Sequence, residues 1–225
     1  MIKSSFVTFA LVTFVASGAF AAGDKTYTLS KDKTKTAVSQ GSMHYAPPPQ
    51  IRPGASSVFS NIGKKYPKGL HFCCYGDTIS GASAGVGGAF AAAMQFTPAS
   101  DMKITEIEAA VGHVQGANSV TLSLYDDNGG VPGNLIASGT ATNLGVFGDC
   151  CQMAVANLNQ ANVTGGTPYW VAVSASGNTW DAWALNSTDQ VDLLTAAYSS
   201  DGGATWGAGG ALPAPAFQVR GKASD

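Results

Sequence analysis

The sequence has few charged side chains and, after its first 22 residues, no long apolar segment. Only 12% of its 225 residues are charged, and no later run approaches the about 20 apolar residues that a membrane-spanning helix needs. No stretch of helical length repeats its apolar residues every three or four positions, so a helical or parallel α/β domain is excluded. Glycine is abundant, at 28 residues. This composition is typical of a turn-rich β protein.

The N-terminus has the pattern of a bacterial export signal. A short positive start precedes the uncharged apolar run Phe6–Phe20, and Ala19-Phe20-Ala21 supplies the small residues that a signal peptidase recognises. We predict a signal peptide over residues 1–22, cleaved after Ala21 or Ala22; the alternative is an uncleaved anchor. No cysteine lies at the cleavage point and no anchor helix ends the chain. We therefore expect a soluble mature protein, secreted to the extracellular space or periplasm, without a transmembrane segment.

Charge is distributed unevenly after the signal peptide. Residues 23–69 hold eight basic and two acidic residues, a net charge of +6, whereas the chain from residue 71 onward has a net charge of −9. Proline-containing segments such as Ala46–Pro49 predict a basic extended arm or linker over 23–69, with a weak edge strand near Tyr27–Leu29. One folded domain is expected over 70–225. The arm would fold back on the acidic body, reach anionic polymers, or act as a solubilising linker, and nucleic acid is a poor partner for so acidic a body.

From about residue 71 the sequence reads as β-strands separated by turns. Apolar and small or polar residues alternate, a period of two typical of half-buried strands. The expected strands cover 90–96, 105–111, 120–125, 152–158, 167–174, 179–185 and 217–219. Glu106 and Glu108 alternate with apolar residues, so we expect both on a solvated face. Together these segments predict an all-β fold, an antiparallel β-sandwich of jelly-roll type.

Six short segments of the chain resemble a known family in their sequences and in their order along the chain. They are Phe96–Pro98, Ser123–Gly133, Phe147–Cys151, Gly166–Val171, Thr179–Trp183 and Ser199–Trp206. In this respect residues 70–221 resemble the choice-of-anchor family of secreted bacterial surface proteins. The resemblance implies a β-sandwich exported to the cell envelope or beyond, and it implies no enzymatic activity. Members of the family typically end in an anchoring signal, which we do not find in this sequence.

The four cysteines form two vicinal pairs, Cys73-Cys74 and Cys150-Cys151. An even count in an oxidising compartment predicts disulfides. Neighbouring Cα atoms lie about 3.8 Å apart, less than the about 4.4–6.8 Å of ordinary bridges, so a bridge within a pair would be strained. We therefore expect Cys73 or Cys74 to pair with Cys150 or Cys151. The alternative is a metal or redox site, but the usual C-x₂-C spacing does not occur.

Two short motifs carry possible chemistry. The segment from Ser199 to Trp206 matches the Asp-box, in which Asp201 binds backbone amides of a hairpin, Gly203 takes a positive φ, and Trp206 packs beneath. A sialidase-like propeller needs a copy in each blade, so this single copy predicts a structural hairpin. Gly81–Gly85 matches the G-x-S-x-G nucleophile pattern, but the helix that this motif requires is not expected after it.

The remaining candidates for a metal-binding or catalytic site are oxygen-bearing side chains and histidines. Asp126, Asp127 and Asn128 could offer oxygens to Ca²⁺, although the segment lacks the length and terminal glutamate of an EF-hand loop and a plain hairpin turn explains it equally well. No other cofactor is expected. The three histidines, at positions 44, 71 and 113, show no motif that pairs them.

Aromatic residues provide the candidate ligand site: Trp170, Trp180 and Trp183, with Asp181. Trp180 and Trp183 are three residues apart and so face opposite ways in a regular strand, which predicts one in the core and the other exposed beside Asp181. An exposed indole next to a carboxylate can stack on a sugar and bind its hydroxyl groups. The alternative is that both rings fill the core.

These features favour a secreted, non-enzymatic protein of the cell envelope or matrix. Its expected partner is an extracellular polysaccharide or another envelope component, bound through an exposed tryptophan. One alternative is a structural or adhesive surface module without a small ligand. The other is a glycan hydrolase with two carboxylates about 5–10 Å apart, for which Asp126, Asp181 and Asp201 are candidates.

Overall fold

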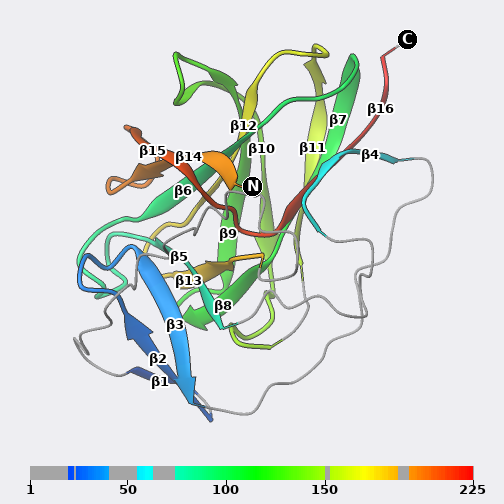
Figure 1. Ribbon diagram of the computed structural model, residues 1–225. Coiled ribbons are helices and arrows are strands. Elements are labelled where there is room, and N and C mark those ends of the chain that lie inside the picture. The colour runs from blue at the N-terminus through cyan, green and yellow to red at the C-terminus, as the bar shows by residue number, and fades with distance from the viewer. Residues whose placement is uncertain are drawn as a thin grey trace, which may run out of the picture.

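The computed structural model describes residues 20–22, 24–40, 55–62, 74–149, 153–186 and 193–224 (Figure 1). Every regular element in these ranges is a β-strand, and neighbouring strands of each sheet run antiparallel. The predicted all-β sandwich is confirmed. Within the same ranges, no helix is long and apolar enough to cross a membrane.

The strands form three sheets. Sheet I contains, in spatial order, β1 (Phe20–Ala22), β2 (Lys25–Leu29), β3 (Lys35–Gln40), β5 (Tyr75–Ser80), β13 (Trp180–Ala184) and β8 (Val111–Gln115). Sheet II contains β10 (Pro132–Thr142), β9 (Ser119–Asp127), β12 (Tyr169–Ser174), β6 (Ala91–Phe96), β14 (Leu193–Ser199) and β15 (Gly207–Pro213). Sheet III contains β11 (Ala154–Val163), β7 (Met102–Ala109), β16 (Phe217–Ala223) and β4 (Ser56–Ser60). In Figure 1 sheet I lies at the lower left, sheet II above it, and sheet III to the right.

Sheets I and III are joined at a junction of three alanines. The chain passes from β7 to β8 at Ala110, whose N–H donates to the carbonyl of Ala216. Ala216 donates in turn to Ala184, and Ala184 to Ala110, each at 2.9 Å. Because backbone hydrogen bonds connect the two sheets here, they form one layer of the sandwich opposite sheet II.

The main core lies between sheet II and this joined layer. All three sheets contribute buried apolar side chains to it, for example Ile79 and Trp183 from sheet I, Leu122 and Val171 from sheet II, and Ile107 and Phe217 from sheet III. A second apolar cluster, which we call the outer core, covers the opposite face of sheet I. Its members include Tyr27, Val86, Phe147, Trp180 and Ala182. Sheet I is therefore buried on both faces.

The expected extended arm is wrong for residues 24–40 and 55–62, which lie in the sheets. β2 and β3 belong to sheet I and β4 to sheet III, and the weakly predicted strand at 27–29 is part of β2. Lys25 Nζ lies 3.0 Å from Asp149, and Lys35 pairs with Asp77. Of the three fates considered for this basic segment, the described part folds back on the acidic body. Residues 41–54 and 63–73 lie outside the described ranges.

The solvated face predicted for β7 is also wrong. Glu106 and Glu108 are buried, at 4% and 5% exposure, and so is Arg220 on the neighbouring strand β16. Arg220 Nε lies 2.5 Å from Glu108 and 3.7 Å from Glu106, and Gln218 donates to the other oxygen of Glu108. The two acids can be buried because a cation and an amide compensate them.

Candidate functional site

Trp170, Trp180 and Trp183 are all fully buried, so the prediction that Trp180 or Trp183 is exposed is wrong, and the alternative that both rings are core residues is confirmed. Trp180 and Trp183 do face opposite ways, as their spacing predicts. Trp180 lies in the outer core beside Tyr27, and Trp183 lies in the main core, edge to face against Phe217. Both are buried because sheet I has a core on each face. In this arrangement none of the three rings is open to a sugar.

Trp170 lies in a third, smaller cluster on the face of sheet II that points away from the main core. Its Nε1–H donates to Asp127 Oδ1 at 2.8 Å, and Gln95 donates to the same oxygen. Tyr125 and Trp206 pack against this cluster and meet edge to face, with ring centroids 6.1 Å apart. Both of these rings are half-buried, so the partly exposed aromatic residues of this face are not the predicted ones.

Asp181 is buried and paired with His113. β13 and β8 are neighbours and place the two residues opposite each other, with His113 Nδ1 2.7 Å from Asp181 Oδ1. Burial raises the pKa of Asp181 to about 6, although the hydrogen bond with His113 opposes this shift. Asp181 Oδ2 has no hydrogen-bond partner among the described residues. No sequence motif links His113 to Asp181, because 68 positions separate them and only the strand order brings them together.

A second buried carboxylate, Asp77, lies on the same face of sheet I. The register places it opposite Lys35 on one side and opposite Trp183 on the other. Lys35 Nζ donates to Asp77 Oδ1, and also to the hydroxyl of Tyr198 at 3.2 Å. Asp77 is 1% exposed and Lys35 19%. Within the described chain, Asp77 Oδ2 likewise lacks a hydrogen-bond partner.

The electrostatics of this cluster follow from its burial. Burial raises the pKa of Asp77, and the neighbouring Lys35 opposes the shift. Burial and the charge of Asp77 raise the pKa of Tyr198 to about 12, so its hydroxyl stays protonated at neutral pH. Lys35 also lies over the ring of Tyr198, 5.1 Å from the centroid. The cluster is a charge-compensated pair with a tyrosine attached.

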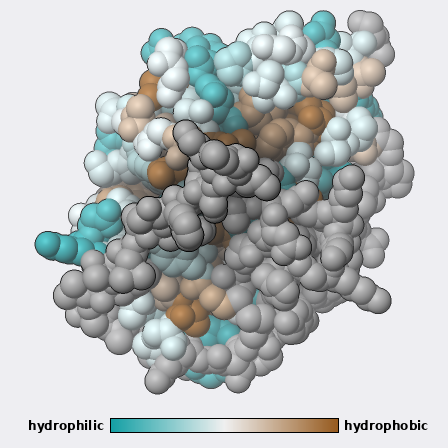
Figure 2. Space-filling view, in the orientation of Figure 1, coloured by the Kyte–Doolittle hydropathy of each residue, from teal (hydrophilic) through white to brown (hydrophobic). Residues whose placement is uncertain are grey.

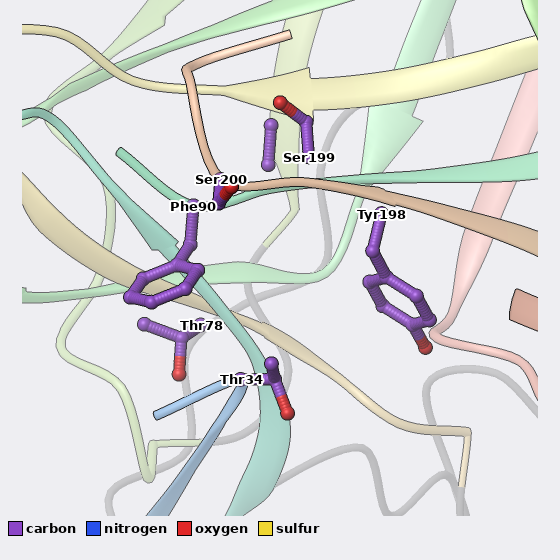
Figure 3. A pocket seen from close by; sticks show the side chains of 7 residues that line it. Thr34, Thr78, Phe90, Tyr198, Ser199 and Ser200 are labelled. Atoms are coloured by element: carbon purple, nitrogen blue, oxygen red, sulfur yellow. The ribbon is translucent and has the colours of Figure 1, made fainter. Parts of the chain in front are cut away.

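A cavity of about 180 Å³ opens beside this cluster (Figure 3). Its lining residues come from sheets I and II and the turns next to them: Thr34, Thr78, Phe90, Ala91, Tyr198, Ser199 and Ser200. Figure 3 shows the rings of Phe90 and Tyr198 apart from each other, with Thr34 between them. The lining thus combines aromatic rings with hydroxyl groups. No local sequence pattern marks this site, because its residues come from separate strands and turns and meet only after the sheets pack.

The Asp-box beside this cavity has the predicted geometry. Asp201 accepts the N–H and hydroxyl of Thr205 at 2.9 and 2.6 Å, and Ser199 donates to it at 2.6 Å. Gly202 and Gly203 have φ of 78° and 97°, a region that favours glycine. The hydrogen bonds from Ser199 and Thr205 lower the pKa of Asp201, which is exposed. The motif closes a hairpin, as its single copy predicts.

The turn proposed for calcium is held by protein hydrogen bonds. Asp126 accepts the backbone N–H of Asn134 at 2.5 Å and its side-chain amide at 2.9 Å. Asp127 Oδ2 accepts the N–H of Gly130 at 3.3 Å. No group of three or more acidic, histidine or cysteine side chains in the described chain is placed to hold a metal ion. Calcium at Asp126, Asp127 and Asn128 stays a prediction.

Of the G-x-S-x-G segment and the cysteine pairs, the structure describes the first completely and the second only at Cys74. Gly81–Gly85 lies in a turn that leads to β6 without a helix, and Ser83 donates its backbone N–H to Gly177 at 2.8 Å. The strand–turn–helix context of a nucleophile elbow is therefore absent at this segment. Cys74 is in its disulfide-bonded form, but Cys73 and Cys150-Cys151 lie outside the described residues. The pairing stays a prediction.

Comparison with known proteins does not add a family to these observations. No model of a known protein family matches the chain, and no curated protein matches it either. The cavity and the two buried carboxylates are therefore the features from which a function can be inferred.

Proposed function

We propose that this protein is an exported, non-enzymatic glycan-binding β-sandwich of the cell envelope or extracellular matrix, similar to the choice-of-anchor proteins. The observation that carries the proposal is the hydroxyl-lined cavity between sheets I and II, which includes the half-buried ring of Phe90. This cavity replaces Trp170, Trp180 and Trp183 as the binding site. The predicted export signal and the bonded state of Cys74 support an oxidising compartment outside the cytoplasm.

The lining of the cavity suits a neutral sugar. Phe90 offers an apolar ring face, and Thr34, Thr78 and Ser200 offer hydroxyl groups that both donate and accept hydrogen bonds. Lys35 and Asp77, which are next to the lining residues Thr34 and Thr78 in the sequence, compensate each other, so this pair gives no preference for an ionic ligand. A small uncharged polyhydroxylated ring matches this combination.

The size of the cavity limits the ligand. Its volume of about 180 Å³ is below the about 300–1,000 Å³ typical of pockets for drug-sized molecules. It would therefore hold one sugar ring, such as the end of a chain. On the face drawn in Figure 2, hydrophobic residues are visible near the upper right and again below the centre, next to hydrophilic ones.

A binding assay with the purified mature protein tests this proposal. We expect retention on a neutral polysaccharide in a glycan array, and at least about tenfold weaker binding for Phe90→Ala, a loss of about 1.4 kcal/mol. Tyr125→Ala is the matched control, because Tyr125 is also a half-buried aromatic residue but lies in the separate cluster with Trp170. Equal binding by Phe90→Ala and Tyr125→Ala would remove the cavity as the site. A silent array would instead favour the structural or adhesive role.

The hydrolase alternative receives less support from the geometry. Asp181 is fully buried, and the oxygens of Asp126 and Asp201 accept donors of their own turns. Asp77 and Asp181 lie on one face of sheet I, but both are buried between the sheets. None of these four acids lines the cavity.

A further inference from the structure

Lys35 and Asp77 are held against each other in a way that goes beyond an ordinary surface ion pair. They are directly opposed on the paired strands β3 and β5, so backbone hydrogen bonds fix their separation. Asp77 is 1% exposed and uses one oxygen to accept from Lys35 Nζ. Its second oxygen has no hydrogen-bond donor among the described residues. A carboxylate that remains an ion in a protein interior normally has donors for both oxygens.

The pair can lose its buried charges by a proton transfer between its two members. Transfer of one proton from the ammonium to the carboxylate gives a neutral amine and a neutral acid, with no change in total charge. Burial favours this neutral form because it disfavours the charged states of both groups, whereas the neighbouring charge of Asp77 raises the pKa of Lys35 and opposes the transfer. A neutral amine next to a neutral carboxylic acid is the arrangement from which an amide forms.

We propose that Lys35 and Asp77 condense to an intramolecular amide, an isopeptide crosslink between β3 and β5. After the proton transfer, Nζ of Lys35 attacks Cγ of Asp77 and a C–N bond forms. One carboxyl oxygen leaves as water, taking the proton first received from Nζ and a second proton that Nζ loses as the amide forms. Ammonium and carboxylate are thus converted to one amide and one water, and neither an oxidant nor a reductant is needed.

Tyr198 is placed to relay the second proton. Its hydroxyl lies 3.2 Å from Lys35 Nζ, and its ring packs against the main core. A protonated phenol can donate to the departing oxygen while it accepts from the nitrogen. Tyr198 also lines the cavity, so it contacts both the pair and this space.

Among the described residues, the other buried ion pairs of lysine and arginine lack this combination. Asp149, the partner of Lys25, is 17% exposed and lies outside the strands, so no ladder fixes it opposite the amine. Arg220 pairs with Glu108, but a guanidinium keeps its proton under all ordinary conditions and is not a nucleophile. The proposal therefore singles out Lys35 and Asp77. It does not depend on glycan binding.

Peptide mapping of the purified full chain, expressed with its own export signal, tests the proposal. Trypsin cannot cut after an acylated lysine, so we expect the peptide containing Lys35 joined to the peptide containing Asp77, lighter than the two linear peptides by one water. Lys25 is the internal control and should be cut normally. A mass loss of the intact protein alone is not sufficient, because cyclisation at Asp201-Gly202 also releases water.

Two variants separate the crosslink from the ion pair. Lys35→Arg keeps the charge but cannot form the amide, so the joined peptides should disappear. The crosslink encloses a loop in which its two residues are 42 positions apart, and its loss should lower the Tm by about 8–16 °C. Tyr198→Phe should reduce the crosslinked fraction, and full crosslinking in this variant would overturn the relay. Linear peptides for both Lys35 and Asp77 in the wild-type protein would overturn the crosslink itself.

Discussion

Two buried carboxylates on one face of sheet I differ mainly in the base that each one meets. Asp77 faces Lys35 and Asp181 faces His113, and each acid leaves Oδ2 without a hydrogen-bond partner in the described chain. Burial raises the pKa of Asp181 to about 6, so this acid can lose its charge within a mild range of pH. The Lys35 pair cannot, and only proton transfer within the pair or a chemical step removes its charges.

The largest effect should come from breaking the Lys35 pair. Asp77→Ala leaves an unpaired ammonium in a poorly hydrated site, so we expect the free energy of unfolding to fall by about 3–5 kcal/mol. Urea unfolding at pH 7 measures this loss. The control is the double variant Lys35→Met/Asp77→Ala, which should recover part of the stability because no unpaired charge remains. A loss below about 1 kcal/mol for the single variant would show that water reaches Lys35.

A smaller, pH-dependent effect should appear at Asp181. Its pKa of about 6 in the folded protein lies above the ordinary value of 3.8, so the folded state holds this proton more tightly than the unfolded chain does. The contribution of Asp181 to stability therefore falls as the pH rises from about 4 to 6, and its ionised form costs about 3 kcal/mol at neutral pH.

The variant Asp181→Asn tests whether stability falls in this way as the pH rises. The variant should gain about 3 kcal/mol relative to wild type between pH 4 and pH 7, measured as the difference in unfolding free energy in urea at each pH. His113→Gln is the companion variant. It removes the ring whose hydrogen bond and charge lower the pKa of Asp181. The pH range over which Asp181 ionises in the folded protein should therefore move to higher pH. A constant difference between Asp181→Asn and wild type across this range would contradict the prediction.

The smallest effect is expected at Asp201, which is exposed. The pH dependence of its contribution to stability has the opposite sign to that of Asp181. Donors from Ser199 and Thr205 lower its pKa, so its contribution is present at neutral pH and is lost as the pH falls through the folded pKa. Asp201→Asn should be slightly less stable than wild type at pH 7, and this difference should shrink below about pH 4. The same urea titration measures it. A difference that grows on acidification would show that the hairpin does not hold the ionised acid.

Local patterns predicted much of the fold. Alternation over 105–111 and 120–125 predicted parts of β7 and β9, and the spacing of Ser199, Asp201 and Thr205 predicted the Asp-box hydrogen bonds. These features depend on residues a few positions apart. Short-range chemistry was therefore readable from the sequence.

Features that depend on the packing of distant strands were not predictable in the same way. The pairing of Asp181 with His113 requires β13 to lie beside β8, and no motif records that neighbourhood. Trp180 and Trp183 were both buried because the outer core covers the second face of sheet I. The strand β2 begins with a buried lysine, and Lys25 hid an alternation that Tyr27 and Leu29 otherwise display.

The junction of Ala110, Ala184 and Ala216 has a mechanical consequence. A pulling force on the C-terminal end would load β16 along its length, so the ladders on either side of it, to β7 and β4, would resist in shear. Only then would tension reach Ala216 and pass through its backbone bonds into β13 and β8. The three alanines therefore link the end of the chain to the strand that carries Asp181 and Trp183.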